Sequence, residues 1–173
     1  GTTDGSNNAL IRAQVGGYLM KRPYTEGSFV KKGDLFIAYA NGTGEQQLTR
    51  NVKDDVQPAF SPDGKRIAYV GKSHDRWEVS VINPDGSGRQ ALTEGMSSLH
   101  GMDGPIDWSP DSTRLLFQSD TNPFEARIYV VDVNTRKIES VTDGPWFDEA
   151  PSWTADGKSV IFMSTRGGGW TWG

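Results

Sequence analysis

The chain has 173 residues, a formal net charge of −4 and no cysteine. The absence of cysteine excludes disulfides and thiolate metal sites, and the mild charge gives no reason to expect a nucleic acid as partner. No apolar run reaches the roughly 18 residues that a membrane-spanning helix needs. The 21 glycines and 9 prolines are typical of a turn-rich β protein.

The first 33 residues differ in pattern from the rest of the chain. Residues 1–9 lack the charged and apolar regions of a signal peptide, so an exported protein would be represented here by a mature form, a fragment or an engineered piece. Residues 10–33 contain short apolar stretches separated by turns at Glu26-Gly27 and Lys32-Gly33, which predicts short strands. We therefore expect a short β segment over residues 1–33 and a separate β domain over residues 34–173.

Residues 34–49 predict two strands around the turn Asn41-Gly42-Thr43-Gly44. A unit of four strands follows, with tight turns at Asp63-Gly64 and Asp85-Gly86, because Asp-Gly adopts the positive φ that hairpin turns require. Valine, isoleucine, tyrosine and tryptophan fill the strands, as pleated half-buried surfaces favour. The four strands are expected at residues 57–61, 66–71, 77–83 and 89–93.

The next unit repeats this order, and another begins between Trp153 and Thr165. In the first of these two units, the strands after the first one are expected at residues 114–120, 127–133 and 138–142. In the strand at 127–133, apolar residues point to both faces, because Ile128 and Val130 alternate with Tyr129, Val131 and Val133. A strand that is buried on both faces belongs to a sheet packed between other sheets.

One composite phrase occurs three times, from Pro58 to Tyr69, from Pro105 to Phe117 and from Pro151 to Phe162. Its aromatic anchors, Phe60, Trp108 and Trp153, lie 48 and 45 residues apart. A repeat of this length, built from short strands and tight turns, is typical of propeller blades. We expect the three anchors to be largely buried at equivalent places in successive sheets.

The repeats therefore predict an all-β fold of propeller type, with blades of four antiparallel strands. Two whole units and two half units make about three blades, a partial propeller. Closed propellers have about 4–8 blades. The chain is therefore either a piece of a longer propeller or one of several copies that assemble a ring.

The turn and strand-end phrases resemble the β-propeller repeats of the TolB family, the periplasmic component of the Tol-Pal system, over residues 34–170. The resemblance rests on the turns 61–65, 109–111 and 155–158 and on the strand ends 47–49, 91–93 and 140–142. It implies six blades, a periplasmic location and a partner protein or peptide docked at the loops around the channel mouth. The same repeat occurs in the propellers of prolyl-oligopeptidase-like enzymes, so the repeat alone does not decide function.

Residues 1–37 are similar to the periplasmic adaptor (membrane fusion) proteins of efflux pumps, in the stretch from Ile11 to Phe36. In that family this stretch forms the first half of a lipoyl-like β domain. The helical hairpin and second lipoyl half that follow there are absent from this sequence. A chimera, natural or engineered, would explain the combination. Alternatively, residues 10–33 pair as edge strands against the propeller.

Few residues offer chemistry. The two histidines, His74 and His100, lie far apart in expected loops, where an ordinary polar role is commoner than metal binding or base catalysis. No Gly-x-Ser-x-Gly phrase is present. We expect no enzymatic activity and no cofactor.

Acidic residues precede the first strand of successive blades, at Asp54-Asp55, Asp103 and Asp148-Glu149. They would gather at one mouth of the channel and attract a cation or a basic peptide, although capping and loop hydrogen bonds are their commoner role. Apolar residues in the same connections indicate either a contact surface or packing beneath the loop. The candidate binding residues are Met96, Leu99, His100, Met102, Asp103, Trp146, Phe147, Asp148 and Glu149.

The sequence thus predicts a non-enzymatic binding or scaffold module of the bacterial cell envelope. One alternative is the propeller part of a prolyl-oligopeptidase-like serine peptidase, without its catalytic domain. Another is an engineered chimera of β fragments with no evolved activity. A further expectation is a homodimer, in which two copies close a six-bladed ring by completing each other's last blade.

Overall fold

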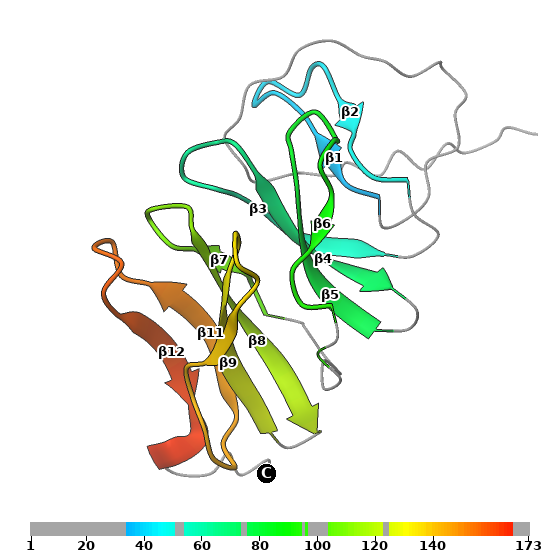
Figure 1. Ribbon diagram of the computed structural model, residues 1–173. Coiled ribbons are helices and arrows are strands. Elements are labelled where there is room, and N and C mark those ends of the chain that lie inside the picture. The colour runs from blue at the N-terminus through cyan, green and yellow to red at the C-terminus, as the bar shows by residue number, and fades with distance from the viewer. Residues whose placement is uncertain are drawn as a thin grey trace, which may run out of the picture.

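The computed structural model describes residues 34–50, 54–73, 76–94, 96, 104–122 and 125–167 (Figure 1). The predictions for residues 1–33, including the lipoyl-like half-motif, lie outside this part of the chain. The described strands are β1 (Phe36–Ile37), β2 (Gln46–Gln47), β3 (Asp55–Phe60), β4 (Ile67–Ser73), β5 (Arg76–Ile82), β6 (Gln90–Ala91), β7 (Asp107–Trp108), β8 (Arg114–Asn122), β9 (Glu125–Asp132), β10 (Ile138–Ser140), β11 (Asp148–Trp153) and β12 (Val160–Ser164). A short 3-10 helix, η1 (Thr165–Gly167), follows β12.

The strands form two complete and two half sheets. Strands β3-β4-β5-β6 and β7-β8-β9-β10 make two four-stranded antiparallel meanders, whereas β1-β2 and β11-β12 make two-stranded sheets. The all-β fold and the four-stranded units expected from the sequence are confirmed. Within the part of the chain that the structure describes, no helix is long and apolar enough to span a bilayer.

The sheets stack face to face, with β1-β2 at one end of the stack and β11-β12 at the other (Figure 1). Three apolar clusters fill the spaces between successive sheets. The prediction that β9 is buried on both faces is confirmed, because its two faces belong to different clusters. Ile128 and Val130 pack toward β11-β12, and Val131 packs toward the first complete sheet.

The aromatic anchors lie at the ends of β3, β7 and β11, as the repeat predicted, but only Trp108 is fully buried. Its indole Nε1 donates a 3.0 Å hydrogen bond to the carbonyl of Ala59 in the preceding sheet. Phe60 and Trp153 are half-buried. The guanidinium of Arg114 lies 4.5 Å from the centre of the Trp153 ring.

A buried threonine closes three of the four described sheets in the same way. Thr49, Thr93 and Thr142 follow the last strand of successive sheets, and each Oγ1 accepts a hydrogen bond from a backbone N–H in, or directly before, the strand that pairs with that last strand. The donors are Leu35, Val79 and Ile128, at 2.9, 2.9 and 3.1 Å. These bonds satisfy buried backbone donors and identify β1-β2 as the third and fourth strands of a blade.

The turns between first and second strands carry a left-handed residue at one fixed position. Gly64 and Gly157 have φ of 69° and 66°, and Ser112 occupies the same place at 61°. Glycine adopts this conformation without steric cost, whereas a serine in the same conformation carries a steric cost from its Cβ. The Ser112 hydroxyl also accepts a 3.1 Å hydrogen bond from the Asp63 N–H of the neighbouring turn, which connects the two complete sheets.

Candidate binding site at the loop end of the sheets

The candidate site lies where the first strand of the last sheet begins. Asp148, the first residue of β11, pairs with Ser164 at the end of β12, immediately before η1. The connection from β10 to β11 lies beside the start of β9, where Phe147 forms a parallel bridge with Ala126.

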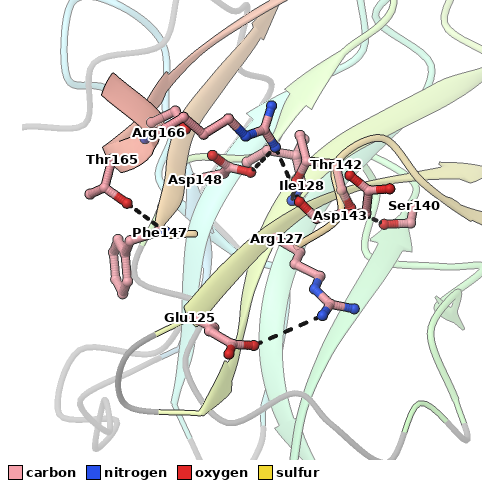
Figure 2. Close-up of polar contacts among 11 residues, drawn as sticks. Glu125, Arg127, Ile128, Ser140, Thr142, Asp143, Phe147, Asp148, Thr165 and Arg166 are labelled. Carbon is pink, nitrogen blue, oxygen red and sulfur yellow. Dashed lines mark hydrogen bonds and ion pairs between the residues drawn. The ribbon is translucent and has the colours of Figure 1, made fainter. Parts of the chain in front are cut away.

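The backbone of Trp146 and Phe147 accepts and donates hydrogen bonds on two sides. Figure 2 shows the contact between Phe147 and Thr165. On one side the Ala126 N–H donates to the Trp146 carbonyl at 3.2 Å, and Ala126 forms a parallel bridge with Phe147. On the other side the Phe147 N–H donates to Thr165 Oγ1 at 3.1 Å, and the Thr165 N–H donates to the Phe147 carbonyl at 3.2 Å. The Trp146 side chain is 36% exposed on this fixed backbone.

An ion pair between a buried carboxylate and a partly exposed guanidinium lies beside this loop. Asp148 is 1% exposed, and its Oδ2 accepts a 2.8 Å hydrogen bond from Nη2 of Arg166. The same nitrogen donates to the Asp143 carbonyl at 3.3 Å (Figure 2). The guanidinium also lies 5.6 Å from the centre of the Phe162 ring. Arg166, which follows β12, thus contacts both Asp143 of the loop and Asp148 of β11 and ties these segments together.

The corresponding acidic residue of the first complete sheet is also buried. Asp55 begins β3 as Asp148 begins β11, and Gly71 of β4 leaves room for it, since a Cβ there would lie 2.7 Å from Asp55 Oδ1. The guanidinium of Arg89 lies 5.8 Å from the centre of the Tyr69 ring in the same sheet. Both carboxylates are thus buried at the start of a first strand.

The structure brings together Trp146, Phe147, Asp148 and Glu149 of the predicted site. Met96 is half-buried and packs against the cluster between the two complete sheets. The remaining candidates, Leu99, His100, Met102 and Asp103, and also His74, lie outside the described residues. Among the described residues, no three acidic or histidine side chains converge as metal ligands.

Sequence reasoning missed the roles of Thr165 and Arg166. The repeat contained a signal for them, because both directly follow the second strand of the last unit, opposite the start of its first strand. No such arginine occurs at the same place in the other two units, where Ser73 and Thr121 stand. A search for what differs between repeats would have singled it out.

Stacked four-stranded meanders with repeated threonine and turn contacts define a protein of the β-propeller class. The family model of the TolB beta propeller domain matches residues 17–170, and the chain belongs to this family.

Individual relatives agree with this assignment. The Tol-Pal system protein TolB of Bordetella pertussis is 31% identical over 155 residues, which cover 88% of this chain and 32% of that protein. The crystal structure of TolB from Acinetobacter baumannii matches with a TM-score of 0.63 and 31% identity, over 78% of this chain and 33% of that one. An uncharacterized peptidase of Bacillus subtilis, YuxL, is 31% identical over 66% of this chain and 18% of its own length. The chain thus spans about a third or less of these three relatives.

Proposed function

We propose that the chain is a non-enzymatic module of the bacterial cell envelope that binds a protein or peptide in the periplasm. Its family and its similarity to proteins named for the Tol-Pal system support this proposal. The observation that carries it is the presentation of Trp146, a large and partly exposed aromatic side chain on a backbone that is bonded from both sides. Aromatic residues in a fixed geometry are favoured at binding surfaces because little conformational entropy is lost on binding.

The groups beside Trp146 indicate the chemistry of the partner. Asp143 is exposed, Glu149 is half-buried, and Arg166 points a partly exposed guanidinium into the same region. A peptide with an apolar side chain next to a basic one would meet the indole and the acidic groups together. In this proposal the predicted residues Met96, Leu99, His100, Met102 and Asp103 belong to the same end of the molecule.

The test is binding of a purified soluble Pal protein, measured by calorimetry. Trp146→Ala should weaken the dissociation constant by about tenfold or more, as truncation of an aromatic hot spot does. Val141→Ala is the matched control, because Val141 is another apolar side chain, 41% exposed and outside the loop 143–148. Absence of binding by the unmodified protein, or equal losses for the two variants, would count against the proposal.

The peptidase alternative rests on the similarity to YuxL. In that case the chain would be the propeller part of an enzyme whose catalytic domain lies elsewhere, and the purified chain itself would still be inactive. We expect no hydrolysis of peptide or ester substrates. Reproducible turnover that disappears when one serine, histidine or aspartate is replaced would overturn the non-enzymatic proposal.

We propose a second copy of this chain as a further partner. The two half sheets, β1-β2 and β11-β12, lie at opposite ends of the stack and together contain the four strand types of one blade (Figure 1). Two copies that exchange these halves would close a ring. Light scattering of the purified 173-residue chain, which measures its mass in solution, tests this self-association.

A further inference from the structure

The turn between β1 and β2 contains an exposed Asn-Gly pair, Asn41 and Gly42. Gly42 has φ of 77°, and nothing lies within 4 Å of the place that a Cβ would take. In the whole sequence, Asn41 is the only asparagine that a glycine follows. Because glycine has no side chain, its backbone nitrogen is the least hindered one that can attack the side-chain amide of the preceding residue.

The Asn41 side chain is folded forward over the turn. Its Oδ1 accepts hydrogen bonds from the Thr43 N–H at 3.0 Å and from Thr43 Oγ1 at 2.8 Å. Two donors on one carbonyl oxygen polarise the amide and stabilise the negative charge that develops on this oxygen during an attack. No described residue accepts a hydrogen bond from Asn41 Nδ2, so this group can leave as ammonia.

One hydrogen bond must open before this attack. The Gly42 N–H donates to the Tyr39 carbonyl at 2.8 Å. Exposed backbone hydrogen bonds open at a small cost in free energy, and Asn41 and Gly42 are both exposed. The bond to Tyr39 therefore slows the attack without preventing it.

The equivalent turn of the first complete sheet has the same geometry but a different functional group. Counting six residues from each N–H donor of the buried threonine contacts places Asp85 and Asn134 at the position of Asn41. Asp85 Oδ1 accepts from the Ser87 N–H at 2.8 Å and from Ser87 Oγ at 2.6 Å. These bonds hold the pKa of Asp85 below its usual value, and an ionised carboxylate resists attack by a nitrogen nucleophile.

The equivalent turn of the second complete sheet has the amide but not the glycine. Asn134 is followed by Thr135, whose branched Cβ crowds the backbone nitrogen. The Asn134 Oδ1 accepts a 3.4 Å hydrogen bond from Arg66 Nη2. A further asparagine, Asn83, is followed by Pro84, which has no N–H. Among the described turns, only the one between β1 and β2 combines a neutral amide, a glycine and two donors on the amide oxygen.

We propose that Asn41 is a site of spontaneous deamidation and that Thr43 promotes the reaction. The Gly42 nitrogen forms a bond to Asn41 Cγ, and the Cγ–Nδ2 bond breaks. Nδ2 leaves as ammonia together with the proton that the Gly42 nitrogen loses. Water then opens the cyclic imide at either of its two carbonyls, which leaves aspartate or isoaspartate at position 41.

The two products should differ in their effect on the first described sheet. Aspartate reproduces the group that Asp85 already presents in the same geometry. Isoaspartate inserts a side-chain carbon into the backbone, so the turn can no longer keep its hydrogen bonds. The sheet also contacts its neighbour, because Gln46 Nε2 donates to the Asp85 carbonyl at 3.4 Å. We expect isoaspartate to loosen β1-β2 and aspartate to leave it intact.

The first experiment follows deamidation of the purified 173-residue chain by peptide mapping during incubation at mildly alkaline pH. Trypsin releases Asn41, Asn83 and Asn134 in separate peptides, 33–50, 77–89 and 128–136, each with a single asparagine. We expect peptide 33–50 to be converted to its acid forms about tenfold or more faster than the other two, which lack an unhindered glycine nitrogen. No conversion of peptide 33–50, or conversion at the rate of peptide 128–136, would overturn the proposal.

The second experiment tests the two products by hydrogen exchange. The isoaspartate form, separated from the incubated protein by chromatography, should exchange faster in β1-β2 than the unmodified protein. Asn41→Asp is the matched control and should exchange as the unmodified protein does. Equal exchange of the isoaspartate form and Asn41→Asp would contradict the expected difference between the products.

The third experiment tests the role of Thr43. Thr43→Val keeps the shape of the side chain and the backbone donor but removes the hydroxyl, so the deamidation rate should fall about two- to tenfold, as the loss of one hydrogen bond predicts. Thr113→Val is the matched control, because the Thr113 hydroxyl donates to Asp111 in another turn. It should leave the rate at Asn41 unchanged. An unchanged rate in Thr43→Val, or equal slowing in both variants, would overturn the role of Thr43.

Discussion

The interface between the two complete sheets and the outer side of the last sheet are built from the same repeated phrase, yet they differ in burial. At the inner interface the small Ala68 and Val70 are fully buried, whereas the larger Ile161 and Met163 stand exposed at the equivalent places of β12. The strand backbone is the same in both cases. Burial here is a property of the neighbouring sheet and not of the strand, which is why the repeat alone cannot assign it.

The largest expected effect breaks the inner interface. Trp108→Ala should lower the free energy of unfolding by about 3–5 kcal/mol, because it leaves a cavity in the core and removes the hydrogen bond to the Ala59 carbonyl. Trp153→Ala, at the equivalent but half-buried place, should cost clearly less. Denaturant unfolding of the two variants measures the difference, and equal losses would contradict the comparison.

The next effect loosens only the attachment of the last sheet. Asp107 Oδ2 accepts hydrogen bonds from Ser152 Oγ at 2.9 Å and from the Trp153 N–H at 2.8 Å, across the interface from β7 to β11. Asp107→Ala should cost about 1–3 kcal/mol. Hydrogen exchange should accelerate in β11-β12 more than in β4-β5.

A control for this experiment is Asp85→Ala. Among the described residues, the carboxylate of Asp85 accepts hydrogen bonds only from Ser87 in its own turn. It should leave the exchange of β11-β12 unchanged. Uniform acceleration over all sheets after Asp107→Ala would show that this contact stabilises the whole chain and not the last sheet in particular.

A smaller effect concerns the cluster next to β1-β2 and depends on pH. Burial raises the pKa of Tyr69 to about 12, above its usual value near 10. The stabilising contribution of the protonated hydroxyl is therefore complete below about pH 10 and is lost as the pH rises toward 12. Tyr69→Phe should remove this alkaline loss in a series of melting temperatures. Identical alkaline curves for the variant and the unmodified protein would contradict the assignment.

The smallest expected effect lies in the exposed turns. Hydrogen bonds from the hydroxyls of Ser109 and Thr113 and from the Thr113 N–H lower the pKa of Asp111 to about 2, from 3.8. Since the folded pKa lies below the unfolded one, the contribution to stability is complete above about pH 4 and is lost as the pH falls toward 2. Asp111→Asn should flatten the acid limb of the stability curve slightly. A steeper acid limb in this variant would be the contrary result.

The sequence predicted the strands well because each strand is bounded by its own turn chemistry. The strand expected at residues 127–133 is observed as Glu125–Asp132, and its two-faced burial is confirmed. The turn without glycine, at residues 134–137, places Arg136 at φ 60°, a conformation that arginine seldom adopts. Local rules thus located the turn correctly but did not predict which residue would adopt the left-handed conformation.

The sequence did not predict the bulges in the first strands. Gln57 and Ala150 have φ of 55° and 50°, each directly before a proline, where extended conformations are usual. The Ala150 N–H is satisfied by Gln118 Oε1 of the neighbouring sheet at 2.9 Å. Because the compensating acceptor belongs to another blade, no local pattern could reveal the bulge.

The sequence by itself determined the class of fold, since strand propensity, Asp-Gly turns and a spacing of 45 to 48 residues act locally and recur. Only the tertiary structure decided which equivalent residues are buried, which carboxylate pairs with Arg166, and how the loop of Trp146 is fixed. The physical reason is that burial and ion pairing depend on the adjacent sheet, and adjacent sheets contact each other through residues far apart in the chain.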